Sequence, residues 1–260
     1  MTEANTNPNA DYQPARAVIC VAHADDIEFG MAGTVARWVA SGAQVTYVII
    51  TDNRSGSNDP DADIPALIKT REREQIAAAN EIGVTDVRFL GYRDGNLQPT
   101  LELRKQLTAI IREVRPQAVM TLDPETIIAA GRDYINHPDH RAAGEATLYA
   151  VFPSAETRPI FPELLDDGLE PWKVNKLFMT LTNHPDTTID ISATIDRKKA
   201  ALHHHKSQLN EDVIEMVSQW NTQAGEEYGF AYAETFRVLN LNEDELEQNL
   251  SENETQETTS

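Results

Sequence analysis

Short runs of β-branched residues alternate with amphipathic stretches over the first half of the chain. The runs predict strands at residues 15–22, 45–50, 87–90 and 118–122. The stretches between them predict helices at residues 27–41, 64–82 and 100–114. Strands that alternate with helices of this length form βαβ units around a parallel sheet. The pattern therefore predicts an α/β fold with a mostly parallel sheet.

The loops that follow these strands should gather at one edge of the sheet. Right-handed crossovers place them beyond the carboxyl ends of the strands, where ligands bind in open α/β sheets. The loops concerned are residues 23–28, 51–60, 91–97 and 123–139. Beyond residue 150 prolines interrupt the pattern, so we expect an irregular C-terminal part. Its expected elements are a strand near 174–181, a helix near 194–208 and a short strand near 236–239.

One imidazole and three carboxylates follow the first predicted strand, between His23 and Glu28. Carboxylates packed together raise one another's pKa and are costly to bury without a compensating cation. A divalent metal ion is the simplest compensator, and His23 and Asp26 can both face one ion. The alternative is a plain helix start, with Asp25 or Asp26 as the N-cap and Glu28 in the first turn.

A second polar cluster, Asn136 to Arg141, ends the loop after the fourth predicted strand. Asp139 can cap a helix there, so that His137 and His140 flank the helix start. The alternative is a solvated cap whose histidines are incidental. Because both clusters follow parallel strands at the same edge, their side chains can converge.

The single cysteine restricts which residues can hold a metal. Cys20 lies in an apolar run and is expected to be a core thiol, so the chain can form neither an internal disulfide nor a thiolate zinc cage. His23, Asp26 and His140 remain as a His₂Asp set with an open position, which is typical of catalytic zinc. Another divalent metal is the alternative.

Two of the ionisable side chains that remain after these ligands are assigned could take part in a reaction. Asp25 can take a proton from metal-bound water. His137 can meet developing negative charge or help to protonate a leaving group. The combination suits metal-assisted hydrolysis.

Further motifs accompany these two clusters along residues 15–240. They are Asp25-Asp26-Ile27-Glu28-Phe29-Gly30 with Gly33-Thr34, Arg71 with Glu74 ahead of Gly83-Val84, Phe89-Leu90-Gly91-Tyr92 with Asp94-Gly95, His137-Pro138-Asp139-His140-Arg141-Ala142, His205-Lys206-Ser207-Gln208, and Tyr232-Ala233-Glu234-Thr235-Phe236-Arg237. In this order the motifs resemble those of the LmbE-like (PIG-L) zinc-dependent N-deacetylases. That family includes the deacetylases of GlcNAc-phosphatidylinositol and of the mycothiol and bacillithiol precursors.

The resemblance implies a fold, a cofactor and a set of roles. The fold would be a Rossmann-like three-layer sandwich. The zinc ion would be held by the set given above: His23, Asp26 and His140. Asp25 would be the general base, His137 would polarise or protonate the intermediate, and Asp139 would orient a neighbouring histidine.

Three further residues would bind substrate: Arg71, Asp94 and Tyr134. By the resemblance, Arg71 would grip the distal group of the substrate. The sequence departs from the family at two places. Ala24 replaces the usual proline, which loosens the turn but removes no ligand. Ile135 occupies the place of the tyrosine that the mycothiol branch has two residues before the first histidine, and the neighbouring Tyr134 is the candidate to substitute for it.

We therefore expect a zinc-dependent hydrolase that removes the N-acetyl group from a GlcNAc-containing or related small molecule. Two alternatives stay open: a metal-dependent hydrolase of another amide or ester, and a non-catalytic carbohydrate-binding relative. The full set of site residues argues against the second. The part of the substrate beyond the sugar would be read by the loops at residues 52–60 and 153–172.

Other prominent residues are given structural interpretations. His203, His204 and His205 are consecutive and would point apart on a helix, so we do not expect a second metal site. His205 should pack near the first site or its rim, and the tryptophans are expected in the core or at the rim. A Gly-x-Gly-x-x-Gly turn is absent, which argues against a dinucleotide enzyme.

The charge excludes several partners. A net charge of −20 without a basic run argues against nucleic acid as a partner, and no apolar run long enough to insert into a membrane is present.

The start of the chain lacks a secretory pattern, so we expect a cytoplasmic protein. Whether it forms a homo-oligomer stays open. Residues 241–260 carry seven acidic and no basic residues, which predicts a disordered tail.

Three segments result: a flexible N-terminus at 1–14, one deacetylase domain at 15–240, and the acidic tail. Without the seven charges of the tail, the net charge falls from −20 to −13. Only seven lysines are present, and a surface rich in carboxylates and poor in lysine is typical of a protein from a high-salt cytoplasm. An ordinary acidic cytosolic protein is the alternative.

Overall fold

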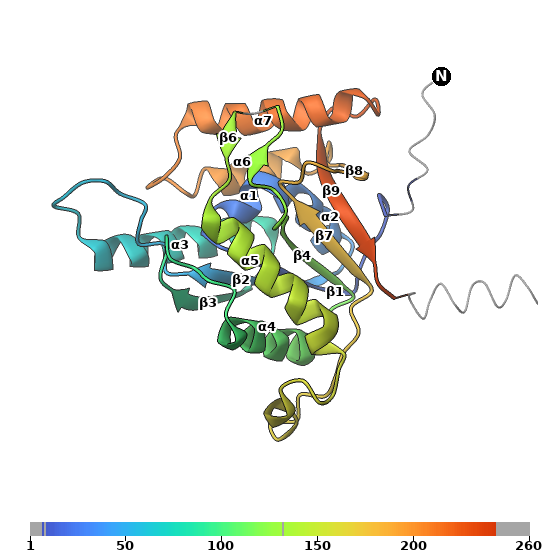
Figure 1. The fold of residues 1–260 in the computed structure, drawn as a ribbon. Helices are drawn as coiled ribbons and strands as arrows, with labels where there is room; N and C mark the ends of the chain where they lie inside the picture. Colours follow the sequence, from blue (N-terminus) through green and yellow to red (C-terminus); the bar gives the residue numbers. More distant parts are fainter. Residues whose placement is uncertain (1–6, 8, 132, 243–260) are drawn as a thin grey trace, which may run out of the picture.

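A seven-stranded sheet with the order β3-β2-β1-β4-β7-β9-β8 forms the centre of the computed structural model (Figure 1). The structure describes residue 7, residues 9–131 and residues 133–242. The strands are β1 (Arg16–Val21), β2 (Gln44–Thr51), β3 (Asp86–Tyr92), β4 (Ala118–Leu122), β7 (Lys176–Thr180), β8 (Thr187–Asp190) and β9 (Ala233–Asn240). From β3 to β7 neighbours are parallel, whereas β9 runs antiparallel to β7 and β8. A separate hairpin pairs β5 (Ile128–Ala129) with β6 (Tyr134–Ile135).

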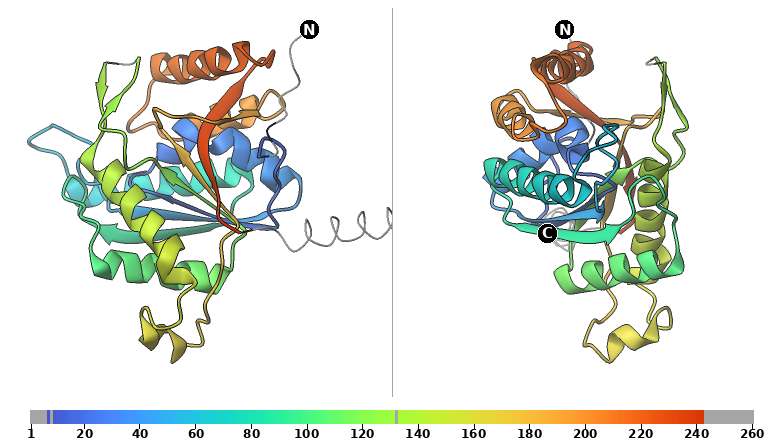
Figure 2. Two further views of the ribbon diagram at one scale, coloured as in Figure 1. Left: turned by 45° about the vertical axis from the view of Figure 1, so that its right-hand side comes forward. Right: turned by 90° about the vertical axis from the view of Figure 1, so that its left-hand side faces the viewer.

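Helices cover both faces of the sheet, as Figure 2 shows. One layer holds α1 (Asp26–Gly30), α2 (Ala32–Ala40), α3 (Ile64–Ile82) and α6 (Ile195–Leu202). The other holds α4 (Leu101–Val114) and α5 (Pro138–Tyr149), followed by the short turns η1 (Ala150–Ala155) and η2 (Pro162–Leu165). The helix α7 (Glu211–Glu226) packs on β9, β8 and α6. The expected Rossmann-like three-layer sandwich with a mostly parallel sheet is confirmed.

Local sequence signals explain where the first helices begin and end. The side chain of Asp63 accepts a hydrogen bond from the Ala66 N–H and starts α3, and Thr100 caps α4 in the same way. Gly83, at a positive φ of 95°, ends α3. The apolar strands fit a sheet covered on both faces, since the last five residues of β1 are buried.

Several expected boundaries differ from the structure. The helix expected over 27–41 is interrupted at Met31, and the helix expected over 194–208 ends at Leu202. The strand β8 and the helix α7 were not expected. A start signal for α7 is present in the sequence, because Asn210 caps it and two acidic residues, Glu211 and Asp212, occupy its first turn.

The described part of the N-terminal segment contacts the body. The Trp38 indole donates a hydrogen bond to the Tyr12 carbonyl, and Lys176 donates one to the side chain of Asn9. The expected disordered tail lies almost entirely outside the described residues, which end at 242. No described helix combines the length and apolarity needed to span a bilayer. Cys20 is fully buried, and burial raises the pKa of its thiol to about 12, as expected for a core thiol.

The strand order reverses beside β1. The chain passes from β1 to β2 and β3 on one side, and then crosses to β4 and β7 on the other. Loops leaving β1 and β4 therefore diverge and leave a crevice at the carboxyl edge between them. The crevice brings residues 23–28 close to residues 123–140.

Close packing of α5 on β4 fixes one side of this crevice. A Cβ atom on Gly144 would lie 2.2 Å from the Leu122 carbonyl oxygen, so only glycine allows the approach. The start of α5 carries His137 and His140, whose positions depend on this contact.

We expect Gly144→Ala to lower the free energy of unfolding by about 1–3 kcal/mol because the added methyl overpacks the contact. Helix propensity alone would change stability by about 1 kcal/mol in the opposite direction. Urea unfolding followed by circular dichroism measures the difference. Glu145→Ala, at the exposed neighbouring position, is the control and should stay within about 0.5 kcal/mol of the parent. An alanine variant as stable as the parent would contradict the packing argument.

Candidate active site

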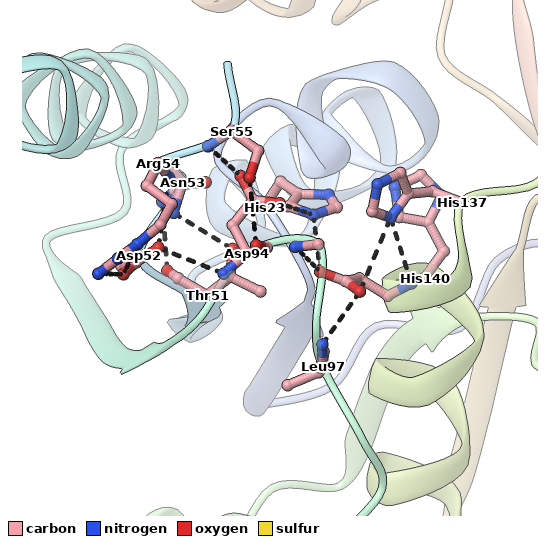
Figure 3. Close-up of polar contacts among 12 residues, drawn as sticks. His23, Thr51, Asp52, Asn53, Arg54, Ser55, Asp94, Leu97, His137 and His140 are labelled. Atoms are coloured by element: carbon pink, nitrogen blue, oxygen red, sulfur yellow. Dashed lines mark hydrogen bonds and ion pairs between the residues drawn. The ribbon is translucent and has the colours of Figure 1, made fainter. Parts of the chain in front are cut away.

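Side chains from three loops converge at the carboxyl edge of the sheet. His23 and Asp26 follow β1, Asp94 follows β3, and His137 and His140 begin α5. All of them line one cavity of about 980 Å³. Figure 3 shows His23, Asp94, His137 and His140 gathered between the loop after β2 and the start of α5.

The structure brings together the three residues expected to hold a metal. His140 Nε2 lies 3.0 Å from Asp26 Oδ1, and His23 Nδ1 lies 3.6 Å from Asp26 Oδ2. One donor atom from each residue lies within 4.8 Å of the others, so the set could hold a single ion. Burial acts to raise the pKa of Asp26, but His140 and His23 outweigh it and hold that pKa well below its usual range.

A hydrogen bond orients His140. Its Nδ1 lies 2.8 Å from Asn136 Oδ1, while Asn136 Nδ2 donates to the Thr126 carbonyl. Asn136 Oδ1 is therefore the acceptor, which places the imidazole proton on Nδ1 and leaves Nε2 free to bind a cation. A metal-binding histidine is commonly held in this manner by its second nitrogen.

Asp139 joins His23 and His137 in a second group of potential ligands. Its two oxygens already accept hydrogen bonds from the N–H groups of Gly95 and Leu97, at 2.7 and 3.1 Å. Its Oδ2 also lies 3.5 Å from His23 Nε2. Asp139 is therefore suited to fixing the loop after β3 and the His23 ring, which favours the His23, Asp26 and His140 set as the ligands.

The expectation that Asp139 caps α5 is wrong. The N-cap is His137, whose Nδ1 accepts a hydrogen bond from the Asp139 N–H at 3.2 Å. Asp139 is instead turned toward Gly95 and Leu97, because two backbone donors there satisfy its charge. Burial and the nearby His23 lower the pKa of His137. A neutral His137 that accepts at Nδ1 carries its proton on Nε2.

Asp25 lies at the cavity wall in a left-handed conformation, with a φ of 95°. Although it is the N-cap of α1, its side chain makes no capping hydrogen bond, so a plain helix cap does not explain it. Its carboxylate lies 3.3 Å from Arg71 Nη2. Burial raises the pKa of Asp25 to about 6, against the opposing effect of Arg71.

A buried chain of polar residues behind Asp25 was not expected from the sequence. The Asp25 N–H donates to Gln75 Oε1, and Gln75 Nε2 donates to Glu28 Oε1. Glu28 Oε2 in turn lies 3.2 Å from His205 Nε2. The chain supports the strained backbone of Asp25. His205 thus packs beneath the site, as the sequence suggested.

The candidate substrate-binding residues occupy different depths. Arg71 is buried and donates to the Ala24 carbonyl at 2.8 Å, so much of its hydrogen-bonding capacity holds the turn after β1. Asp94 is also buried; its Oδ1 lies 3.2 Å from His23 Nε2, and its Oδ2 accepts the Ser55 N–H. Tyr134 lies at the cavity wall on the β5–β6 hairpin and is 42% exposed.

The cavity walls are only partly those expected. From the loop at residues 52–60, Ser55 and Gly56 line the cavity. The expectation for residues 153–172 is wrong, because no described residue of that segment lines it. Figure 1 shows η1 and η2 at the opposite end of the molecule from α7. Residues 180–183, Pro185 and α7 supply the far walls instead.

The comparisons with known proteins agree with this site. The family model described as PIG-L, GlcNAc-PI de-N-acetylase, matches residues 18–151. The chain belongs to the PIG-L family. A diacetylchitobiose deacetylase of Thermococcus kodakarensis is 31% identical over 240 residues, which cover 89% of this chain and 86% of that protein. The family resemblance drawn from the motifs is thus confirmed.

Two other relatives extend the comparison. The structure of an N,N'-diacetylchitobiose deacetylase from Pyrococcus horikoshii matches with a TM-score of 0.81 and 30% identity, covering 90% of this chain and 86% of that one. A probable N-acetyl-alpha-D-glucosaminyl L-malate deacetylase 2 of Bacillus anthracis is 28% identical, with coverage of 85% and 93%. The names of these relatives therefore include both a chitobiose derivative and a malate conjugate.

We expect His140→Ala to lose most of the divalent metal that the parent chain retains, because it removes a donor. Asn136→Ala should weaken metal affinity by about 10–100-fold, since the ring is then no longer oriented. His137→Ala is the matched control and should retain the metal. Elemental analysis of zinc-loaded, dialysed protein measures these contents. Equal losses from His137→Ala and His140→Ala would contradict the assignment of ligands.

Proposed function

We propose that this PIG-L protein is a zinc-dependent N-deacetylase that hydrolyses the N-acetyl group of a GlcNAc-containing or related small molecule. One observation carries the proposal. A His₂Asp donor set, a separate carboxylate at Asp25 and a neutral imidazole at His137 face the same cavity. The named activities of the Thermococcus and Pyrococcus relatives support an N-acetylated sugar as substrate.

The donors fit a divalent cation such as zinc. Two imidazoles and one carboxylate are the ligand types that catalytic zinc takes, with a position left for reactants. The carboxylates of Asp139, Asp26 and Asp94 outweigh burial and raise the pKa of His23 well above its usual range. The site therefore attracts positive charge. When bound, the cation would make water more acidic and polarise the acyl carbonyl.

Asp25 would act as the general base and then as the general acid. It lies beside Asp26 but outside the donor set, and Arg71 and Gln75 fix its position. Its carboxylate would take a proton from the attacking water as the new C–O bond forms. The same proton would pass to the amine nitrogen as the C–N bond breaks, which balances the hydrolysis.

His137 would stabilise the negative charge that develops on the acyl oxygen. Its Nδ1 is occupied by the Asp139 N–H, so only Nε2–H can point into the cavity. A neutral donor held by a helix start is pre-organised for this role. Of its two expected roles, polarising the intermediate is the one this geometry favours.

Arg71, Asp94 and Tyr134 would position the sugar. Arg71 and Asp94 can contact hydroxyl groups of the sugar through those donor and acceptor atoms that are not used in contacts within the protein. Tyr134, on the hairpin at the cavity wall, can reach substrate from the open side. Its hydroxyl is the candidate replacement for the family tyrosine.

We expect Asp25→Asn to lower kcat by about 10²–10⁴-fold, because the amide cannot accept the proton. Zinc content should stay at the parent level, as Asp25 is not a ligand. Release of free amine from N-acetylated sugars by the zinc-loaded protein measures the rate. Asp61→Asn, an exposed aspartate outside the cavity, controls for loss of charge and should retain the parent rate.

Two results would overturn this proposal. Full activity of Asp25→Asn would remove Asp25 from the reaction. Hydrolysis of other amides or esters without any amine release from N-acetylated sugars would leave metal-dependent hydrolysis but change the substrate.

A further inference from the structure

The peptide unit that precedes Asp25 is held at both of its polar ends. Its carbonyl, from Ala24, accepts a hydrogen bond from Arg71 Nη2 at 2.8 Å. Its N–H, from Asp25, donates to Gln75 Oε1 at 3.0 Å. Arg71 and Gln75 are both buried and lie four residues apart on α3, so one face of that helix supplies both partners. The carbonyl and the N–H of a trans peptide point in opposite directions, so the two contacts together fix the orientation of the peptide plane.

The orientation of this peptide plane sets the φ angle of Asp25, because φ is the rotation of the preceding peptide about the N–Cα bond. The observed φ is 95°, in the left-handed region that residues other than glycine seldom adopt. Such a conformation is strained and persists only where the surrounding structure enforces it. The two contacts with α3 provide that constraint.

Without this constraint the carboxylate of Asp25 would have a competing place. Asp25 occupies the N-cap position of α1, where an aspartate normally has an extended backbone and a side chain that accepts an N–H of the first turn. In the structure the side chain makes no capping bond, and the carboxylate faces Arg71 and the cavity. A carboxylate engaged by the first turn of α1 could not also take a proton in the cavity. The capping conformation and the proposed role in the reaction therefore exclude each other.

Glu28 determines which end of the Gln75 amide faces Asp25. The amide has one accepting and one donating end, whereas a carboxylate only accepts. Gln75 Nε2 donates to Glu28 Oε1 at 3.1 Å, which leaves Gln75 Oε1 to accept the Asp25 N–H. The second oxygen of Glu28 lies 3.2 Å from His205 Nε2. Gln75, Glu28 and His205 are at most 1% exposed, so the orientation of the amide is fixed from within the core.

Gln75 is not among the described residues that line the cavity, and the hydrogen bonds of its side chain go to Asp25 and Glu28. We propose that Gln75 is a positioning residue for the deacetylation reaction, which holds Asp25 in the left-handed conformation and keeps its carboxylate in the cavity. Glu28 shares this role by orienting the Gln75 amide. The proposal rests on the proposed function, in which Asp25 is the general base.

The conformation of Asp25 provides a test that needs no activity. Gln75→Met nearly conserves the size of the side chain but removes both hydrogen bonds. In a crystal structure of the full-chain variant, we expect Asp25 to have a negative φ and a carboxylate that accepts an N–H of the first turn of α1. An Asp25 φ that stays near 95° would overturn the proposal.

The kinetic test uses the zinc-loaded full chain and amine release from N,N'-diacetylchitobiose. We expect Gln75→Met to lower kcat by about 10²-fold, because a displaced base is poorly aligned with the attacking water. KM and zinc content should stay at the parent level, since Gln75 contacts neither the cavity nor the donor set. Gln219→Met makes the same change at an exposed position outside the cavity wall and should keep the parent kcat.

The kinetic outcomes separate this proposal from the proposed function. A parent-level kcat in Gln75→Met would overturn the positioning role. A parent chain that releases no amine from N-acetylated sugars would instead contradict the proposed function.

Combination with Asp25→Asn separates positioning from a general loss of structure. A residue that acts only through Asp25 has nothing left to position once the base is removed. Gln75→Met should therefore lower the kcat of Asp25→Asn by less than about twofold. A further loss of about 10²-fold in the double variant would show that Gln75 acts elsewhere, and would overturn the proposal.

An exchange of amide and carboxylate serves as the rescue, and it provides the kinetic test if circular dichroism shows that Gln75→Met does not fold. Gln75→Glu alone places two carboxylates side by side and should lower kcat as Gln75→Met does. Adding Glu28→Gln restores a donor between the two side chains, so that the Asp25 N–H again has a fixed acceptor. We expect the pair of substitutions to raise kcat at least about tenfold above that of Gln75→Glu, and no recovery would overturn the proposal.

Discussion

The arrangement of the site depends on a buried group of carboxylates whose negative charge must be balanced by positive charge. Asp26 is its centre, because it accepts the N–H of His23 and also faces the ring of His140. These contacts join the turn after β1 to the start of α5, which lies more than a hundred residues later. The two segments can meet because β1 and β4 are adjacent in the sheet. A cation at this point would satisfy a charge arrangement that the fold itself creates.

The other carboxylates of the site divide between holding the structure and remaining available for chemistry. The carboxylate oxygens of Asp139 and Asp94 accept hydrogen bonds from backbone N–H groups and contact the His23 ring. These contacts fix the loops after β2 and β3. Asp25 differs, because its backbone takes the structural contact with Gln75 and its carboxylate faces Arg71 and the cavity. Asp25 occupies the N-cap position of α1, but its backbone is left-handed and its side chain makes no capping hydrogen bond.

The outer part of the cavity comes from a different part of the chain than the donor set. The donor set comes from the parallel half of the sheet, whereas the outer wall comes from α7 and residues 180–185. In this chain α7 contributes apolar side chains such as Met216 to that wall, whereas residues 180–185 contribute the polar side chains of Thr180, Thr182 and Asn183.

The sequence alone determined the parallel strands, the helices between them and the residues most suited to a metal site. Those features follow from local patterns: buried β-branched runs, capped helices, and polar clusters placed after strands. The sequence did not determine that His137 rather than Asp139 caps α5, or that Asp94 contacts His23, since those choices depend on donors supplied by distant loops. It also did not place α7 over the site. Only the tertiary structure decided which face of that helix is buried and which lines the cavity, because both faces carry apolar residues and only packing distinguishes them.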